Sequence, residues 1–138
     1  MNAKAANVLR TVAAAVMLGP LVLSSPAVAG GSIAFYLSPQ NGDDAQMMDL
    51  GLRAYALYNG LRHGANVRQH GHGNNAGIGQ NGGGNLGIVD QQGDSHSATL
   101  QQNGNGNSYG VFQFGRNTDA EVVQNGQGQS GAALLFGW

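Results

Sequence analysis

Six glutamines that recur at one constant spacing are the side chains best placed to act together. They stand at every eleventh position: Gln69, Gln80, Gln91, Gln102, Gln113 and Gln124. A buried amide is costly unless it is hydrogen bonded, but stacked glutamines satisfy one another, because each side-chain NH2 can donate to the carbonyl of the next. The spacing predicts an amide ladder that sets the register of stacked chains. The alternative is a low-complexity Gln, Asn and Gly chain that stays disordered.

The histidines and carboxylates predict no catalytic site, no metal site and no cofactor. His63 and His96 occupy one column of the repeat but fall on opposite sheets, and His70 and His72 have no Cys or carboxylate nearby to complete a metal shell. The acidic residues fall on outward or turn positions, where no nucleophile, base and orienting group can be assembled. We therefore expect this protein not to be an enzyme.

A column of aliphatic residues two positions before each glutamine predicts the strands that carry the ladder. It holds Val67, Ile78, Val89, Leu100, Val111 and Val122. Side chains alternate along an extended strand, so this column shares one face with the glutamines and forms a core ladder. A small-residue column lies beside it, with Tyr109 as the exception. The members of that column two units before and after it are Gly87 and Gly131, which conserves volume across layers.

A third column, of eight glycines eleven residues apart, predicts the turns, and six of them stand two positions after a glutamine. It holds Gly60, Gly71, Gly82, Gly93, Gly104, Gly115, Gly126 and Gly137. Glycine supplies the turn angles that other residues resist. Two units make one coil, and coils stack about 4.8 Å apart. We therefore predict an all-β, two-sheet β-solenoid of cross-β, amyloid-forming type, with units from near 63, 85, 107 and 129 in one sheet and from near 74, 96 and 118 in the other.

At the level of motif, the stretch from Gln69 to Gln80 resembles the curlin-associated repeat, Gln-x-Gly-x-x-Asn-x-Ala-x-x-x-Gln, of bacterial curli fimbria subunits. The units that end at Gln102 and Gln124 match too, with His96 and Thr118 in the Asn position. This resemblance implies a secreted functional amyloid that polymerises on the cell surface as an adhesive, biofilm-matrix fibre. The implied partners are other copies of the chain, a nucleator subunit and the curli secretion machinery.

The departures from this pattern leave the role within such a fibre open. Gly87, Tyr109 and Gly131 replace the alanine, and Leu135 replaces the last glutamine. The chain is therefore a major subunit, a surface-bound fibre nucleator or a divergent relative. Another alternative is a monomeric secreted β-solenoid that binds a repetitive surface ligand, although its outward positions vary in residue type.

Residues 1–29 read as a secretory signal peptide. A basic start is followed by an apolar core over 11–23 and by Ala27-Val28-Ala29, which is a cleavage signal. The mature chain is expected to begin at Gly30, to be extracellular and not to insert into a membrane. The alternative, a retained membrane anchor, is weakened by Gly19-Pro20 within a short core.

Residues 30–60 form an N-terminal segment ahead of the repeat domain, 61–138. Within it, 32–37 is either a short strand or a targeting tail. Apolar residues at spacings of three and four predict a helix over 43–59; they are Met47, Leu50, Ala54, Leu57 and Leu61. The alternative is a degenerate repeat unit. If helical, the segment is expected to cap the first coil and shield an open edge.

The last two units of the larger predicted sheet carry apolar residues at outward positions. They are Phe112, Phe114, Leu134, Phe136 and Trp138. Exposed apolar patches ordinarily mark contact surfaces, so these residues are a candidate contact patch, unless the last of them merely fold over the final coil.

Composition supports stacking rather than an ordinary globular core. The 138 residues include 24 glycines and only 9% charged residues, with a formal charge of −1. Little charge means little repulsion between stacked copies. The chain lacks the excess of basic residues that would suggest a nucleic-acid partner. It also lacks cysteine, which excludes disulfides and thiolate sites.

Overall fold

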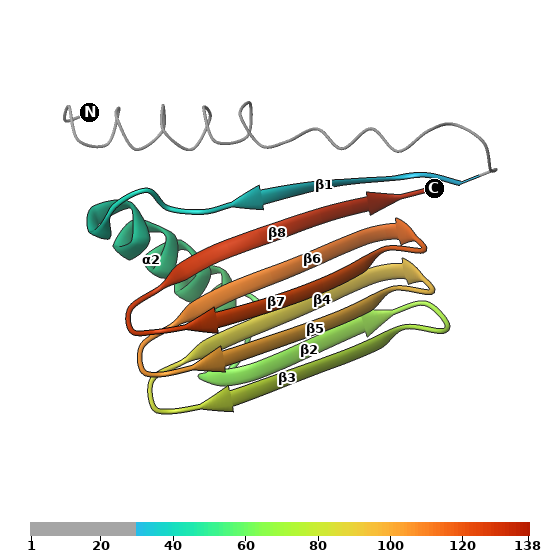
Figure 1. Ribbon diagram of the computed structural model, residues 1–138. Helices are drawn as coiled ribbons and strands as arrows, with labels where there is room; N and C mark the ends of the chain where they lie inside the picture. Colours follow the sequence, from blue (N-terminus) through green and yellow to red (C-terminus); the bar gives the residue numbers. More distant parts are fainter. Residues whose placement is uncertain (1–29) are drawn as a thin grey trace.

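A computed structural model describes residues 30–138, and the expected signal peptide lies outside them. The chain begins with strand β1 (Ser32–Leu37) and helix α2 (Gly42–Tyr58). Seven strands follow (Figure 1): β2 (Gly64–His70), β3 (Asn75–Asn81), β4 (Leu86–Asp94), β5 (Ser97–Asn103), β6 (Ser108–Arg116), β7 (Asp119–Asn125) and β8 (Ser130–Gly137).

The seven strands wind into a β-solenoid with two strands in each coil, which confirms the predicted fold class. Strands β2, β4, β6 and β8 lie in one sheet, and β3, β5 and β7 lie in the other. Neighbours within each sheet are parallel and offset by two units of the repeat, so that Val67 pairs with Val89 and Ile78 with Leu100. The period of the sequence is therefore the register of the sheets.

Strand β1 extends the larger sheet at its β8 edge. It runs antiparallel to β8, with Ala34 opposite Leu135, and Figure 1 shows it along the outside of the last coil. The segment 32–37 is thus a strand in this fold. Among residues 30–138 the smaller sheet has no such addition, and β7 is its last strand.

Asn41 caps the N-terminus of helix α2, and its side-chain oxygen accepts the N–H of Asp44 at 2.9 Å. Such a cap satisfies a backbone donor that the first turn leaves free, and the acidic residues Asp43 and Asp44 suit the positive end of the helix dipole. The predicted helix is confirmed, and the alternative of a degenerate repeat unit is wrong. Within residues 30–138, no helix is long and apolar enough to cross a membrane.

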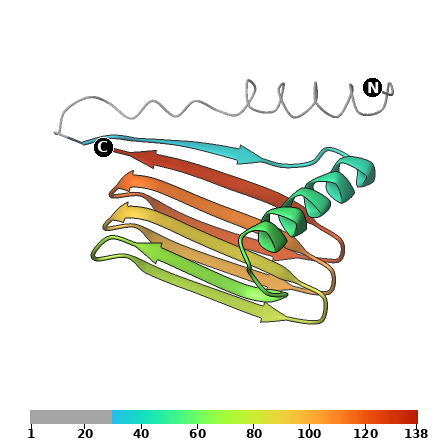
Figure 2. The same cartoon turned by 180° about the vertical axis from the view of Figure 1, so that it is seen from behind.

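The expectation that α2 caps the first coil is wrong. Figure 2 shows the helix lying across the outer face of the larger sheet, where Leu52 and Ala56 pack on Leu86 and Ile88. The topology requires this crossing, because β1 and β2 lie at opposite ends of that sheet. Four strand spacings are about 19 Å, and a 17-residue helix spans about 26 Å.

The buried face of α2 also differs from the predicted stripe. Leu50 and Leu57 are 61% and 82% exposed, whereas Leu52 and Ala56 are buried. The outward side chains of β4 determine which face of α2 is buried, because Leu52 and Ala56 shield Leu86 and Ile88 from water. Gly110 lets the helix come close, since a Cβ there would lie 2.9 Å from the Leu52 side chain.

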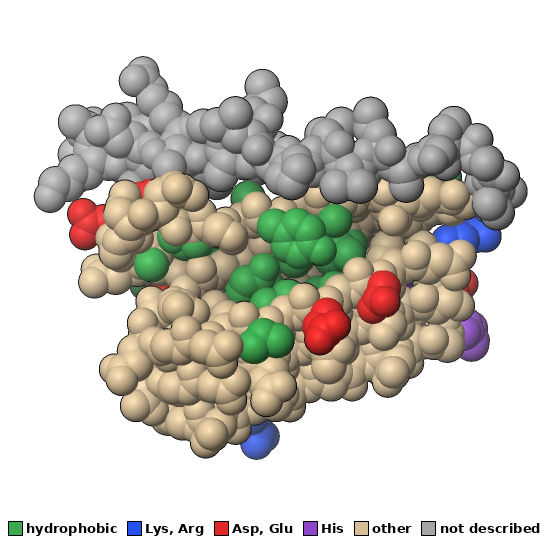
Figure 3. Space-filling model, in the orientation of Figure 1, with side chains coloured by type: hydrophobic (Ala, Val, Ile, Leu, Met, Phe, Trp, Pro, Cys, Tyr) green, Lys and Arg blue, Asp and Glu red, His purple; other side chains and the backbone are tan. Residues whose placement is uncertain are grey.

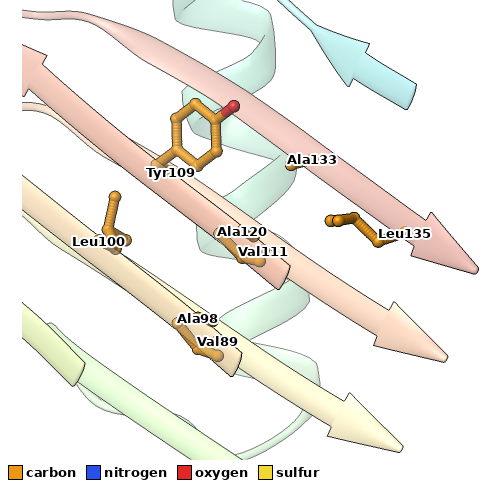
Figure 4. Close-up of a cluster of buried hydrophobic side chains, with 8 residues drawn as sticks. All are labelled: Val89, Ala98, Leu100, Tyr109, Val111, Ala120, Ala133 and Leu135. Atoms are coloured by element: carbon orange, nitrogen blue, oxygen red, sulfur yellow. The ribbon is translucent and has the colours of Figure 1, made fainter. Parts of the chain in front are cut away.

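Between the sheets lies a core of aliphatic side chains and one aromatic ring. In Figure 4, Tyr109 rises from β6 toward β8. A Cβ added to Gly131 would lie 2.6 Å from the Tyr109 ring. The large residue in the small column is therefore accommodated by a glycine one layer away.

Candidate functional site: stacked ladders and open ends

The larger sheet carries a continuous ladder of glutamine amides. Gln69 Nε2 donates to Gln91 Oε1 at 2.8 Å, and Gln91 Nε2 donates to Gln113 Oε1 at 2.8 Å. The second N–H of Gln91 donates to the backbone carbonyl of Asn75 at 2.9 Å. Gln91 and Gln113 are completely buried, so these bonds replace the water that both amides lose on folding.

The smaller sheet carries an equivalent ladder. Gln80 Nε2 donates to Gln102 Oε1 at 2.7 Å, and Gln102 Nε2 donates to Gln124 Oε1 at 2.8 Å and to the Leu86 carbonyl at 3.0 Å. In both sheets the donors point from the β2–β3 end of the stack toward the β7–β8 end. Each ladder therefore begins with an acceptor oxygen and points a donor toward its far end.

Asparagines at the start of the strands tie successive layers together. Asn85 Oδ1 accepts the backbone N–H of Asn107 at 2.9 Å, and Asn85 Nδ2 donates to the Gly104 carbonyl at 2.9 Å. Asn74, half a coil earlier, and Asn107, one coil later, make the same pair of bonds. These amides hold the turns in register, so the stack is fixed at its corners as well as in its core.

His96 occupies this asparagine column and is 1% exposed. Its Nε2 lies 3.2 Å from the Gln92 carbonyl, which can only accept, and its Nδ1 lies 2.8 Å from Thr118 Oγ1. Both ring nitrogens are thus used in hydrogen bonds between protein groups. Over the part of the chain that the structure describes, no group of three or more His, Asp or Glu side chains could hold a metal ion.

The column of turn glycines allows the layers to approach closely. Gly93 has φ +126°, and a Cβ there would overlap the carbonyl oxygen of Gly115 in the next layer. Gly71, Gly82 and Gly104 meet the next layer in the same way. Only glycine fits where both the backbone angle and the space exclude a side chain.

Residues 84–115, from the turn before β4 through β6, match the family model of the curlin associated repeat. The chain carries curlin-associated repeats. No curated protein and no solved structure matches it. The observed pairing extends the curlin-type repeat beyond the matched residues in both directions, to β2 and to β8.

Two of the predicted turn glycines have other roles outside the repeating turns. Gly60, with φ +68°, follows the end of helix α2. Gly137 lies at the end of strand β8, as Gly93 and Gly115 lie near the ends of β4 and β6, but within the described residues no turn to a further strand follows it. The column extends one unit too far at each end, because the first unit is replaced by a helix and the chain ends on a strand.

The end layers of the curlin-type stack are only partly covered. Val89, Leu100 and Val111 are completely buried, but Val67 is 44% exposed, and the predicted core position of Val67 is therefore wrong for the isolated chain. Ile78 and Val122, also in end layers, are half-buried. A strand at the end of a stack has a neighbour on one side only, so its inward side chains stay accessible.

The two glutamine ladders end differently at the β7–β8 end. In the larger sheet Leu135 follows Gln113. Gln113 Nε2 donates to the Ser97 carbonyl at 2.8 Å, as Gln91 does to Asn75, and to the Thr118 carbonyl at 3.2 Å in place of a next glutamine. In the smaller sheet Gln124 Nε2 donates to the Ser108 carbonyl at 3.3 Å. Its second N–H has no acceptor among residues 30–138.

The predicted contact patch does not form one exposed surface. Phe112 packs under α2, with its ring edge to face against Tyr55 at 5.2 Å. The other members lie along the same face: Phe114, Leu134, Phe136 and Trp138. Phe114 stacks on Phe136 at 5.2 Å, and only Phe136 and Trp138 are more than a third exposed. The exposed part of the patch is therefore smaller than predicted.

A buried carboxylate that the sequence reasoning missed holds α2 on the curlin-type repeats. Asp90 is 2% exposed; it accepts a hydrogen bond from the Tyr55 hydroxyl at 3.0 Å and lies 3.9 Å from Arg68 Nη1. Arg68 also donates to Asn59 Oδ1 at 2.9 Å. Burial, and then the bond to Asp90, raises the pKa of the Tyr55 phenol. The sequence feature that could have revealed this contact is a pair of outward apolar residues on the same strand, Leu86 and Ile88.

Proposed function

We propose that this protein is a non-enzymatic structural subunit of a curli-like extracellular amyloid fibre, which grows as one copy adds strands to another. One observation carries the proposal: both glutamine ladders run in the same direction along the stack. A stack with an acceptor at one end and a donor at the other is complementary to a second copy of itself.

The open strands provide the energy for such growth. Unpaired backbone N–H and C=O groups at the end of a sheet are a template for another strand. The exposed Val67 side chain loses its contact with water when a strand covers it. With only 9% charged residues, repulsion between copies is small.

The biological setting that we propose follows from the repeat family. The fibre would support cell adhesion and a biofilm matrix at the outer surface, after export of a chain that begins near Gly30. A nucleator subunit and a curli-type export machinery are the proposed partners, together with further copies of this chain. No nucleic acid, membrane insertion or cofactor has a role in this proposal.

Fibre formation by the chain 30–138 tests the proposal. At tens of micromolar we expect thioflavin-T fluorescence to rise after a lag, and the product to give a reflection at about 4.7–4.8 Å. The matched variant replaces Gln91 and Gln113 by Glu, which stacks like charges in one ladder and should slow assembly. A chain that remains monomeric for days without this reflection would contradict the proposal.

A second candidate within the same class is a fibre nucleator. The observation that favours it is Leu135, which ends the ladder of the larger sheet after Gln113. A nucleator should abolish the lag of a related curlin subunit when added in substoichiometric amounts. A major subunit should instead be incorporated in proportion to its concentration.

A further inference from the structure

The two ends of the solenoid present different strands. At one end, β2 and β3 are the last strands of their sheets. At the other end β7 is the last strand of the smaller sheet, while β8 is paired with β1. The repeat has seven strands, so the smaller sheet is one strand short of completing the final coil.

This odd number of strands dictates how a second copy can continue the winding. The strand that follows β8 in the repeat belongs on β7, in the smaller sheet. A second copy that continues the coil therefore places its β2 on β7 and its β3 on β8. Because β2 belongs to the larger sheet of its own copy, the two copies are then related by a half-turn about the stack axis.

The inward side chains match in this arrangement. Counting along the repeat, Ala65 of the second copy lies over Ala120, Val67 over Val122 and Gln69 over Gln124. All three pairs place like on like, and the valine pair extends the column that Ile78 and Leu100 begin.

The hydrogen-bonding groups match as well. Gln124 Nε2 has a second N–H without an acceptor among residues 30–138, and Gln69 Oε1 has no donor among them. The ladder of the smaller sheet thus continues through Gln69 of the second copy with the same polarity as within the chain. If β2 were placed on β8 instead, the position over β7 would stay empty and Gln124 would keep its unused N–H. A glutamine faces Leu135 in either arrangement, so that contact does not distinguish them.

We propose that the free edge of β7 is the receptor for β2 of a second copy, in this half-turn arrangement, and that β1 is a removable cap that the incoming β3 displaces from β8. This proposal rests on the proposed fibre function. It adds how two copies are oriented and which strand must leave before a second copy can bind. In the single chain β1 covers the β8 edge. The second copy can therefore add both β2 and β3 only if its β3 replaces β1 on β8.

The surface above β7 is suited to receive a strand. Figure 3 shows hydrophobic side chains gathered in a hollow just above β7. Tyr36 of β1, which pairs with Ala133 of β8, is 50% exposed. A groove of about 450 Å³ is lined by Ser38, Asn41, Tyr109, Gln124 and Gln129 among others. Polar groups at one end and apolar groups along the rest fit the Gln and Val of β2.

β1 is held mainly by its backbone, which suits a strand that must leave. Ala34 is its one side chain packed against the central core. On the outer face, the Phe35 ring meets Phe136 edge to face at 6.4 Å. The incoming β3 brings Gln80 to the position over Leu135, where β1 has Ala34, and Ile78 to the position over Ala133, where β1 has the half-exposed Tyr36.

Cross-linking of single-cysteine variants tests the half-turn arrangement, because the described chain has no cysteine of its own. In the proposed arrangement His70 of one copy lies over Asn125 of the other, and both positions are exposed and outward. Fibres from mixed His70→Cys and Asn125→Cys chains should yield disulfide-linked dimers. Mixed His70→Cys and Phe136→Cys chains, which meet only if β2 lies on β8, should not. The reverse result would overturn the arrangement.

A disulfide between β1 and β8 tests the cap. Gly31 and Trp138 exchange both backbone hydrogen bonds at 2.9 Å, so the pair Ala34 and Leu135, three positions along each strand, is non-hydrogen-bonded and close enough for a disulfide. The oxidised Ala34→Cys/Leu135→Cys chain should lose elongation on preformed seeds, and reduction should restore it. Equal elongation in both forms would overturn the cap while leaving the fibre function intact.

A second variant keeps the cap testable if the double cysteine chain folds poorly. Phe35→Ser removes the contact with Phe136 and should shorten the lag of fibre formation. Leu50→Ser, which removes an exposed apolar side chain from α2, is the matched control and should leave the lag unchanged. An unchanged or longer lag for Phe35→Ser, in a wild-type background that forms fibres, would overturn the cap.

Discussion

The hydroxyl of Tyr55 on helix α2 donates a hydrogen bond to the buried carboxylate of Asp90 on strand β4, at 3.0 Å. This bond joins the only helix among residues 30–138 to the central layers of the solenoid. Asp90 is 2% exposed, and its nearest cation, Arg68 Nη1, is 3.9 Å away. The helix therefore supplies much of the solvation that the carboxylate loses.

Tyr55→Phe should destabilise the fold, because it leaves a buried carboxylate without its closest donor. A hydrogen bond to a charged group contributes about 1.5–3 kcal/mol, and we expect a loss of that size in urea unfolding. Amide exchange in α2 should quicken. Tyr58→Phe is the control, since Tyr58 is 92% exposed; equal effects of the two changes would rule out this role for Tyr55.

Gln102→Leu should be strongly destabilising although leucine has a similar volume. The change leaves Gln80 Nε2 and Gln124 Oε1 without a partner and removes one donor from the Leu86 carbonyl. Each buried unsatisfied group costs about 1–3 kcal/mol, and we expect a total loss of about 2–5 kcal/mol.

The control for Gln102→Leu is Gln101→Leu, on the exposed face of the same strand. Urea unfolding followed by circular dichroism measures both variants. If Gln102→Leu were as stable as Gln101→Leu, the amide ladder would contribute nothing to the fold.

Gly93→Ala should disrupt the stacking of turns. Its φ of +126° strains any L-residue, and its Cβ would overlap the Gly115 carbonyl oxygen. We expect a loss of at least about 2 kcal/mol in the free energy of unfolding. In Gly79→Ala the nearest atom to the new Cβ is 4.0 Å away, and the change should be within about 0.5 kcal/mol. Similar stabilities for both would contradict the close approach of the layers.

Stability should fall at alkaline pH through Tyr109. Burial raises the pKa of this phenol from 10.0 to about 12. The folded state thus favours the neutral phenol, so its contribution is complete below pH 10 and is lost as pH rises from 10 to about 12. The loss amounts to about 2–3 kcal/mol at most.

Urea midpoints measured across this pH range check the prediction for Tyr109. Tyr109→Phe should remove most of the alkaline loss, and the part that belongs to Tyr55, whose pKa is also raised, should remain. A Tyr109→Phe chain that loses stability as steeply as the wild type would assign the effect to other groups.

Most of the stack could be predicted from the sequence because its rules are local and recur. Alternation along a strand places Val89 and Gln91 on one face, and a separation of two repeat units places Gln91 between Gln69 and Gln113. Each layer repeats the same few contacts, so the register predicted from most units holds even where one unit departs from the pattern. The curlin-type repeat, both sheets and both amide ladders follow from this period.

The N-terminal segment was harder to predict, because it contains no repeat. Spacing at three and four residues predicted the helix, but it predicted the wrong buried face, since Leu50 and Leu57 are exposed. The choice of face depends on Leu86, Ile88 and Asp90, which lie far along the chain on strand β4. Helical periodicity alone says nothing about such distant partners.

The period of the repeat determines the coil, the stacking of its ladders and the position of its turns, because each of these is a relation between neighbours in a regular winding. The donor direction of the ladders was seen only in the structure. The pairing of β1 with β8 and the path of α2 between opposite ends of the sheet are relations between segments that no spacing connects. They arise only once the stack has formed and has brought the end of β8 to a place that the first strand can reach.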